Sequence, residues 1–183
     1  MNKIGIFFGT DTGSTRLIAK KIYSMLGEGL ADKPKNINRA SVSELLQYQG
    51  LILGTPSYGK GDLPGLATGC VEANWAEFMP LLDGADFSGK RVAIFGLGNQ
   101  ERYSDRFNSS MMHLYRRFLG YGAEVIGQWS TEGYTFNHSH AVIDDKFVGL
   151  ALDQRTQPHL TDERLKLWLA EITPQLLPMA VAA

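Results

Sequence analysis

Residues 3–15, KIGIFFGTDTGST, decide the fold of this chain. Residues 3–8 form a short apolar run that ends at Gly9, which is typical of a buried parallel strand. An amphipathic helical pattern follows and stops at Gly27 and Gly29. Its expected apolar stripe consists of Leu17, Ile18, Ile22, Met25 and Leu26. The stretch therefore predicts a strand, a tight loop and a helix in immediate succession.

The same alternation of strand and helix continues along the chain. Further strands are expected at residues 36–40, 51–53, 91–95, 123–129 and 147–152. Helical patterns occupy 43–46, 74–82, 105–121 and a last segment for which Thr161 is the expected N-cap. Because strands alternate with helices, we expect a mostly parallel sheet with helices on both faces.

One polar, turn-like segment, residues 130–146, breaks this alternation. Since an apolar strand resumes at Phe147, we interpret the segment as an insertion that interrupts the last strand. No repeat or linker divides the sequence, so we expect a single domain over residues 1–183. The end of the chain, residues 178–183, is expected to be frayed.

The composition fits a folded globular protein. Hydrophobic residues make up 44% and charged residues 20% of the 183 residues, which argues against disorder. The formal net charge of -1 gives no excess of one sign that would favour nucleic acid or a membrane surface. No signal peptide and no apolar stretch of membrane-spanning length is visible, so we expect a soluble cytoplasmic protein.

Metal-binding side chains are few and scattered. Cys70 is the single cysteine, which rules out a disulfide within this sequence and a cysteine metal cluster. The histidines are His113, His138, His140 and His159. We therefore expect neither a metal site nor a catalytic set.

The first strand-to-helix loop contains the strongest chemical signal. It consists of Thr10, Asp11, Thr12, Gly13, Ser14 and Thr15. A helix N-terminus offers unpaired amides and a positive dipole end to an anion, and the four hydroxyls add donors. The loop lacks the lysine of a triphosphate-binding P-loop, so it favours a monophosphate. A Ser/Thr-rich capping turn is the plainer alternative.

Two further loops should meet this one at the carboxyl edge of the sheet, residues 54–64 and 96–104. Each carries a tyrosine, Tyr58 and Tyr103, and the two rings could hold a flat heterocycle between them. Asn99 and Gln100 can donate and accept hydrogen bonds, as the edge of a pyrimidine requires.

At this point the chain resembles a flavodoxin of the long-chain type over roughly residues 3–172. The matching motifs are T-D-T-G-S-T at 10–15, G-T-P-S-Y-G-K-G-D-L-P-G-L at 54–66, F-G-L-G-N-Q-E-R-Y at 95–103 and F-V-G-L-A-L-D at 147–153. Within the family, it is most similar to flavodoxins that donate electrons to nitrogenase. The resemblance implies an α/β fold with a doubly wound five-stranded parallel sheet of order 2-1-3-4-5.

The resemblance also implies FMN as cofactor and assigns residues to it. Residues 10–15 would hold the phosphate, and Tyr103 would stack on the outer face of the flavin. Thr55, Pro56, Ser57 and Tyr58 would form the loop over the inner face. Main-chain groups of Gly98 and Asn99 would bind the pyrimidine edge. The Gly59-Lys60 peptide matches one that flips in the family so that its carbonyl can accept the flavin N5 hydrogen. Gly61, Leu97 and Asn108 complete the expected set.

The implied function is low-potential, one-electron transfer by a monomer that is not itself an enzyme. The implied partners are flavodoxin/ferredoxin-NADP reductase, pyruvate-flavodoxin oxidoreductase and nitrogenase iron protein. The first alternative is an FMN-dependent NAD(P)H:quinone-type reductase on the same fold. The second is a non-redox receiver domain, which is disfavoured because Asp11 is the one acidic residue in the first loop.

This sequence departs from the family in its charge. Flavodoxins are usually strongly acidic, whereas this chain is nearly neutral. Lys60 stands where an acidic or neutral residue is frequent, and Asn99 replaces a common aspartate. Arg102 and Arg106 flank Tyr103. We expect these changes to make the reduced, anionic flavin less unfavourable than in an acidic relative.

Potentiometry of Lys60→Glu and Asn99→Asp tests this expectation. One unit charge about 8 Å away at an effective dielectric of about 40 is worth roughly 1 kcal/mol. That corresponds to roughly 45 mV for a one-electron couple. Each variant should therefore lower the potential for full reduction of the flavin by up to this amount per unit of charge changed, which is one unit in Asn99→Asp and two in Lys60→Glu. Unchanged potentials in both variants would contradict the expectation.

Overall fold

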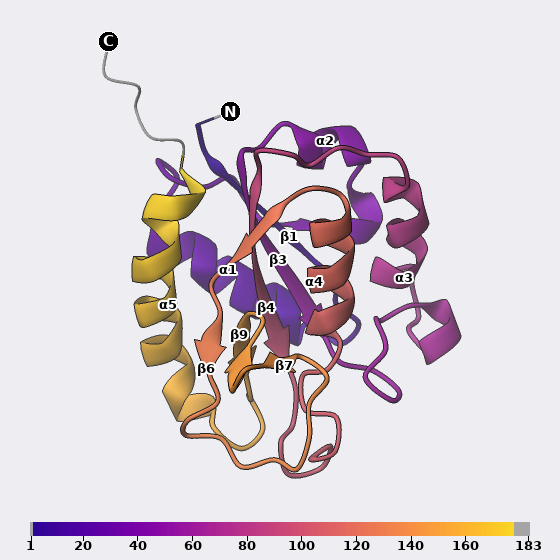
Figure 1. Ribbon diagram of the computed structural model, residues 1–183, viewed down its shortest axis with the longest axis vertical. Coiled ribbons are helices and arrows are strands. Elements are labelled where there is room, and N and C mark those ends of the chain that lie inside the picture. Colours follow the sequence, from indigo (N-terminus) through magenta and orange to yellow (C-terminus); the bar gives the residue numbers. More distant parts are fainter. Residues whose placement is uncertain (1, 178–183) are drawn as a thin grey trace.

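A parallel sheet forms the centre of the computed structural model, which describes residues 2–177 (Figure 1). Its strands are β1 (Ile4–Phe8), β2 (Lys35–Asn36), β3 (Gly50–Pro56), β4 (Arg91–Leu97), β5 (Glu124–Ile126) and β9 (Leu150–Leu152). Their order is β2-β1-β3-β4-β5, and all pairs are parallel. The predicted order is therefore confirmed.

The fifth position of the sheet is filled by two short strands in series. β5 pairs with the first half of β4, where Arg91 is opposite Glu124. β9 pairs with the second half, where Phe95 is opposite Leu150. The sequence prediction of one interrupted last strand is confirmed, although the interruption is longer than residues 130–146.

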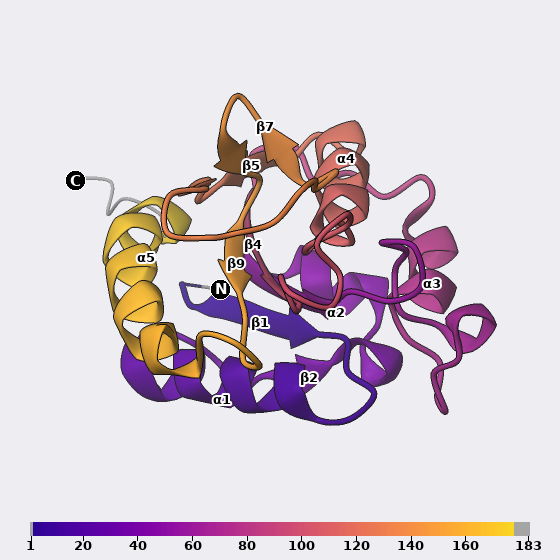
Figure 2. The same cartoon turned by 90° about the horizontal axis from the view of Figure 1, so that it is seen from below.

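Helices cover both faces of the sheet, as Figure 2 shows. α1 (Ser14–Leu26) and α5 (Thr161–Leu176) lie on one face. On the other face are α2 (Val42–Leu46), α3 (Trp75–Phe78) and α4 (Met111–Gly120). Short 3-10 turns lie at Ile37–Arg39, Leu66–Thr68, Met79–Leu82 and Pro158–Leu160.

Each central strand alternates its side chains between two cores. In β1, Ile4, Ile6 and Phe8 pack with α1 and α5, whereas Phe7 packs into the opposite core. Because both faces are buried, such a strand appears in the sequence as an unbroken apolar run. For this reason the apolar run KIGIFF was correctly predicted to be a buried strand.

Several element boundaries differ from the sequence prediction. The strand expected at 36–40 ends at Asn36, whose side chain accepts a hydrogen bond from the Asn38 amide and starts a 3-10 turn. The helix expected at 105–121 begins only at Met111, since Asn108 has a positive φ of 53°. The strand expected at 123–129 ends before Gly127, which has a φ of 83°.

Three side-chain expectations on the helices are also wrong. Leu17 and Met25 were expected in the buried stripe of α1 but are 62% and 43% exposed. Thr161 is the first residue of α5 and not its cap, and its hydroxyl accepts a hydrogen bond from the Gln154 side chain. The end of the chain expected to fray, 178–183, lies outside the described residues.

The insertion contains a small sheet of its own. β6 (Trp129–Ser130), β8 (Lys146–Phe147) and β7 (Val142–Ile143) pair antiparallel in that order. Asp144 and Asp145 connect β7 to β8, and both have a positive φ, as a tight hairpin turn requires. The ring of Phe107 lies 5.4 Å from that of Phe136 and 5.8 Å from that of Tyr134, so aromatic packing fixes the insertion to the main domain.

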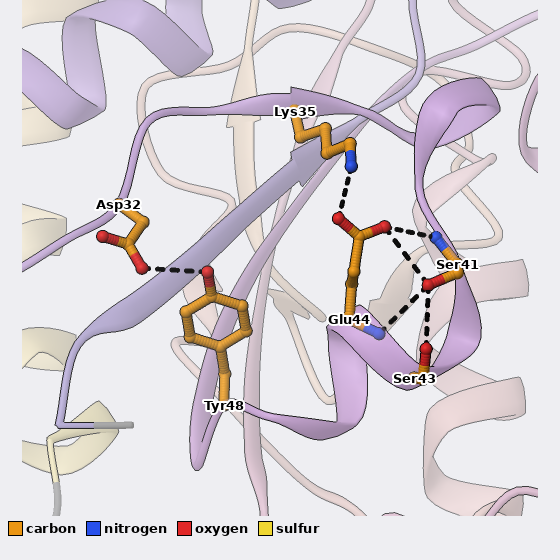
Figure 3. Close-up of polar contacts among 6 residues, drawn as sticks. All are labelled: Asp32, Lys35, Ser41, Ser43, Glu44 and Tyr48. Carbon is orange, nitrogen blue, oxygen red and sulfur yellow. Dashed lines mark hydrogen bonds and ion pairs between the residues drawn. The ribbon is translucent and has the colours of Figure 1, made fainter.

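The outer edge of the sheet is held by polar contacts (Figure 3). Lys35 of β2 pairs with Glu44 of α2, and Glu44 and Ser41 form a capping box. Tyr48 donates a hydrogen bond to Asp32 at 2.9 Å. Burial, together with this carboxylate, raises the pKa of Tyr48 to about 12, so the phenol stays protonated at neutral pH. The ring of Tyr48 fills the space that a side chain at Gly5 would need.

Candidate cofactor-binding site

Three loops leave the same carboxyl edge of the sheet from adjacent strands, β1, β3 and β4 (Figure 2). Backbone hydrogen bonds continue the pairing into their first residues. The Gly9 amide donates to Gly54 at 2.9 Å, and the Ser57 amide donates to Leu97 at 3.1 Å. Beyond β4, the Gly98 amide donates to Leu152 of β9 at 3.0 Å. The sheet itself therefore aligns the loops that the sequence singled out.

The first loop presents an open helix end. Gly13 precedes α1 with a left-handed φ of 96°, and its amide donates to the Thr10 hydroxyl at 3.0 Å. The first turn of α1 has no acidic residue to neutralise its dipole. Thr12 and Ser14 are exposed, whereas Thr15 is buried. Free amides and exposed hydroxyls together suit an anion.

Asp11 braces the first loop against its neighbours. One carboxylate oxygen accepts from the Tyr58 hydroxyl at 3.1 Å, and the other accepts from the Val71 amide at 3.1 Å. Burial and this carboxylate raise the pKa of Tyr58, which therefore stays neutral. The carboxylate is thus engaged by protein donors, and we expect Asp11 to position the loop rather than to contact an anion.

A second brace reaches the first loop from α3. The Asn74 side chain donates to the Thr10 carbonyl at 2.9 Å and accepts from the Trp75 amide at 3.0 Å. The Trp75 indole in turn donates to the Gly54 carbonyl at 2.8 Å. The helical pattern of 74–82 predicted that a helix starts here. Nothing in the sequence indicated that Asn74, at this helix start, supports the first loop.

The second loop begins with a tight turn over residues 58–62. The amides of Gly61 and Asp62 donate to the Tyr58 carbonyl at 2.9 and 2.8 Å. Gly59 and Gly61 have φ values of 54° and 93°, a region that L side chains rarely occupy. Lys60 is exposed at the tip. The glycines at these positions are therefore required by the backbone path.

In the third loop, the two amide side chains have structural partners. Asn99 accepts from the amides of Glu101 and Arg102 at 3.2 and 2.9 Å. Gln100 donates to Asp153 and Thr156 and accepts from the Thr135 amide at 2.7 Å. Both N–H donors of the Gln100 side chain are therefore engaged by protein acceptors, which leaves neither for the edge of a pyrimidine.

Tyr103 is 40% exposed, as a ring that stacks on a ligand must be. The Arg102 guanidinium carbon lies 5.4 Å from the centre of this ring, and that of Arg106 lies 5.2 Å away. Both distances are in the range of cation–π attraction. The two arginines noted from the sequence therefore converge on the stacking candidate.

Asp153 is the buried anchor of this edge and was missed by the sequence reasoning. Its carboxylate accepts from the amides of Gln100, Arg155 and Thr156 and from the Thr156 hydroxyl. Burial alone would raise the pKa of Asp153, but these hydrogen bonds outweigh burial and lower it. The network fixes the third loop to the end of β9.

Three buried polar atoms at the site have no partner among residues 2–177. They are the Ser57 hydroxyl, the side-chain amide oxygen of Asn108 and Nε of Arg106. An unpaired buried polar atom is costly, and a bound ligand can supply the missing hydrogen bond. The Ser57 hydroxyl, at the start of the second loop, therefore fits a ring placed between the tyrosines. Asn108 lies beneath Gly96 and Gly98, so we expect it to act on a ligand through the loop above it.

The remaining expected residues complete the strand ends. Thr55 and Leu97 are buried, and Pro56 is half-buried at the end of β3. Within residues 2–177, no three His, Cys, Asp or Glu side chains gather as metal ligands. The site therefore offers hydroxyls, amides and rings to a ligand.

A parallel sheet of order 2-1-3-4-5, with a hydroxyl-rich loop after β1 and tyrosine-bearing loops after β3 and β4, is typical of the flavodoxin-like class of α/β proteins. The flavodoxin family model matches residues 6–168. The chain belongs to the flavodoxin family.

Individual relatives match over almost the whole chain. A flavodoxin of Klebsiella pneumoniae is 51% identical over 177 residues, which are 97% of this chain and 100% of the relative. A flavodoxin of Synechocystis is 42% identical and covers 96% of this chain and 99% of its own. The crystal structure of a Fusobacterium nucleatum flavodoxin bound to flavin mononucleotide superposes with a TM-score of 0.86 at 34% identity, covering 96% of this chain and 99% of that one.

The lowered pKa of Asp153 predicts a pH-dependent contribution to stability. An unfolded aspartate titrates near pH 3.9, so the contribution is present above about pH 4 and is lost as pH falls through the lower folded pKa. Asp153→Asn should reduce the free energy of unfolding by about 2 kcal/mol at pH 7, since buried hydrogen bonds to a charged group are lost.

Urea unfolding of wild type and variant between pH 7 and pH 3 measures this difference. It should shrink below about pH 4. Asp144→Asn, the same change at an exposed residue of the β7–β8 hairpin, is the matched control and should have little effect. A difference that stays constant down to pH 3 would contradict the assignment.

Proposed function

We propose that this chain binds FMN non-covalently at the loops after β1, β3 and β4 and carries single electrons between redox proteins. The observation that carries the proposal is the open N-terminus of α1 beside two tyrosine-bearing loops. The Fusobacterium relative, which shares the fold over almost its full length, is bound to flavin mononucleotide. FMN has the one phosphate and the flat ring that these loops suit.

In this proposal, each of the three loops binds a different part of the cofactor. Thr12 and Ser14, with the first amides of α1, bind the phosphate. Tyr58 and Tyr103 hold the ring, and main-chain groups of Gly98 and Asn99 meet its pyrimidine edge. Residues 59–61 lie at the tip of the turn beside the ring. The bound flavin supplies the redox chemistry, and the protein orients it and limits its exposure to water.

The site favours a carrier over an enzyme. A quinone-type reductase needs groups that bind a second substrate or move a proton. The one carboxylate of the first loop, Asp11, is held by Tyr58 and Val71, and Tyr58 itself has a raised pKa. His138 and His140 lie in the insertion, where their rings contact each other at 4.9 Å. The relatives reported above are all named flavodoxins.

The physiological partners are redox proteins that deliver or accept one electron. Nitrogenase iron protein, flavodoxin/ferredoxin-NADP reductase and pyruvate-flavodoxin oxidoreductase are the proposed specific partners, on the basis of the sequence resemblance. We also propose a cytoplasmic monomer. Across residues 2–177, no helix combines the length and apolarity needed to cross a bilayer.

Comparison of FMN with riboflavin tests the phosphate site, because riboflavin lacks the phosphate. A hydrogen bond to a charged oxygen contributes about 1.5–3 kcal/mol, so two contribute about 3–6 kcal/mol. The double variant Thr12→Ala/Ser14→Ala should therefore raise the Kd of FMN by about 100-fold or more and leave that of riboflavin unchanged. Fluorescence titration of the FMN-free protein measures both constants.

Ser24→Ala is the control, since Ser24 is exposed on the same helix but far from its start. It should change neither affinity. Equal weakening of FMN and riboflavin in the double variant would show that the loop does not bind the phosphate.

Stepwise reduction of the FMN-loaded protein tests the carrier role. A one-electron carrier should show a half-reduced flavin that accumulates in the visible spectrum at intermediate potential. It should also oxidise NADPH negligibly without a reductase. Rapid direct oxidation of NADPH, with quinone as acceptor, would favour the quinone-type reductase.

A further inference from the structure

The turn over residues 58–62 needs support from outside itself. Its two left-handed glycines leave the backbone with several accessible conformations, and Gly59 and Lys60 are exposed. The Tyr58 side chain fixes the start of the turn to Asp11. The far end of the turn, Gly61 and Asp62, is held by a different segment of the chain.

That segment is the serine pair Ser109-Ser110, which immediately precedes α4. The Ser110 hydroxyl donates to the Asp62 carbonyl. Gly61 packs on Ser109 so closely that a Cβ at Gly61 would lie 2.6 Å from the Ser109 Cβ. The two serines are 1% and 0% exposed. The end of the turn therefore rests on a buried, hydroxyl-bearing surface.

Ser110 occupies the position where a serine ordinarily caps a helix. A capping serine has extended backbone angles and accepts from an amide of the first turn. Ser110 instead has helical angles, φ -61° and ψ -26°, and makes no capping hydrogen bond. Its hydroxyl is directed to the turn, so the helix lacks a cap at the place where the turn gains a support.

The serine pair is also fixed from its other side by the insertion. The Ser109 hydroxyl accepts from the His140 amide at 3.0 Å. The neighbouring backbone is paired as well, since Asn137 and His138 donate to the Ser104 carbonyl and Phe107 donates to the His138 carbonyl. A continuous series of hydrogen bonds and contacts thus runs from residues 137–140 through Ser109 and Ser110 to the turn.

We infer that Ser110 is a positioning residue that selects the conformation of the 58–62 turn, and that Ser109 couples this turn to the insertion. The turn lies beside the proposed flavin position, so the inference about redox behaviour rests on the proposed function. The other part of the inference, that the two serines hold the turn in place, is its mechanical part. It does not rest on the proposed function, because it concerns only contacts within the chain.

Hydrogen exchange of the FMN-free protein tests the mechanical part. The amides of Gly61 and Asp62 report on the turn, because both donate to the Tyr58 carbonyl. Ser110→Ala removes the external hydrogen bond, and exchange at these two amides should accelerate about fivefold. Ser110→Cys, which keeps the side-chain size but donates weakly, should behave like Ser110→Ala. Exchange at the Gly9 amide, which is bonded to Gly54, should not change.

Thr173→Val is the matched control. The half-buried Thr173 hydroxyl also donates to a main-chain carbonyl, that of Leu169 in α5, and it lies outside the contacts that link the insertion to the turn. It should leave exchange at Gly61 and Asp62 at the wild-type rate. Unchanged exchange in Ser110→Ala, or a rise of the same size at Gly9, would overturn the role of Ser110.

Ser109→Ala tests the coupling to the insertion, since it removes the acceptor of the His140 amide. Exchange should rise both at His140 and at Gly61 and Asp62. A rise confined to His140 would overturn the coupling.

Potentiometry of the FMN-loaded proteins tests the redox part. Ser110→Ala should change the separation between the two one-electron potentials, and Thr173→Val should not. An unchanged separation together with faster turn exchange would overturn the redox role and leave the mechanical role intact. Failure of the wild type to bind FMN would refute the proposed function, but it would leave the positioning role of Ser110 in the turn untouched.

Discussion

Direct contact between large side chains and glycine backbone at the carboxyl ends of the central strands is the constraint on which the site depends. A Cβ on Gly54 would lie 2.1 Å from the Phe95 ring, and one on Gly9 would lie 2.6 Å from the Trp75 ring. At Gly96 the same space is filled by the side chains of Asn108 and Met111. Since packed interiors tolerate little change of volume, the contacts of Trp75 and Met111 fix how closely α3 and α4 approach the strand ends. The positions of the loops that follow these strand ends depend on these contacts.

Much of this arrangement could be predicted from the sequence because it is local. Apolar runs such as KIGIFF, followed by glycine and a helical pattern, identify buried strands and their order in the chain. Thr12, Ser14, Tyr58 and Tyr103 were expected at one edge because parallel strands end together, and the structure places them there. Leu17 and Met25 were wrongly expected to be buried. A helical period identifies the apolar side of a helix, but it does not show how much of that side the rest of the protein covers.

What could not be predicted rests on contacts between distant residues. Asp153 anchors Gln100, and Ser110 supports Asp62, but neither pair has a signal in its local sequence. The late start of α4 has the same origin. Residues before Met111 look helical in the sequence, yet Asn108 takes a left-handed conformation beneath Gly96 and Gly98. Tertiary packing overrides local preference in each of these cases.

The divided fifth strand has a consequence for how the molecule folds. β5 follows α4 closely and pairs with residues of β4 that are 33 positions earlier in the chain, as Arg91 and Glu124 are. β9 pairs with residues 55 positions earlier, as Phe95 and Leu150 are, and reaches β4 only after the whole insertion has been closed into a loop. Closing such a loop costs chain entropy before its contacts are gained, which slows the step. Leu152 and Asp153, which hold Gly98 and Gln100, belong to this late segment. A nascent chain would therefore complete the β1–β3–β4 core first and assemble the third loop last.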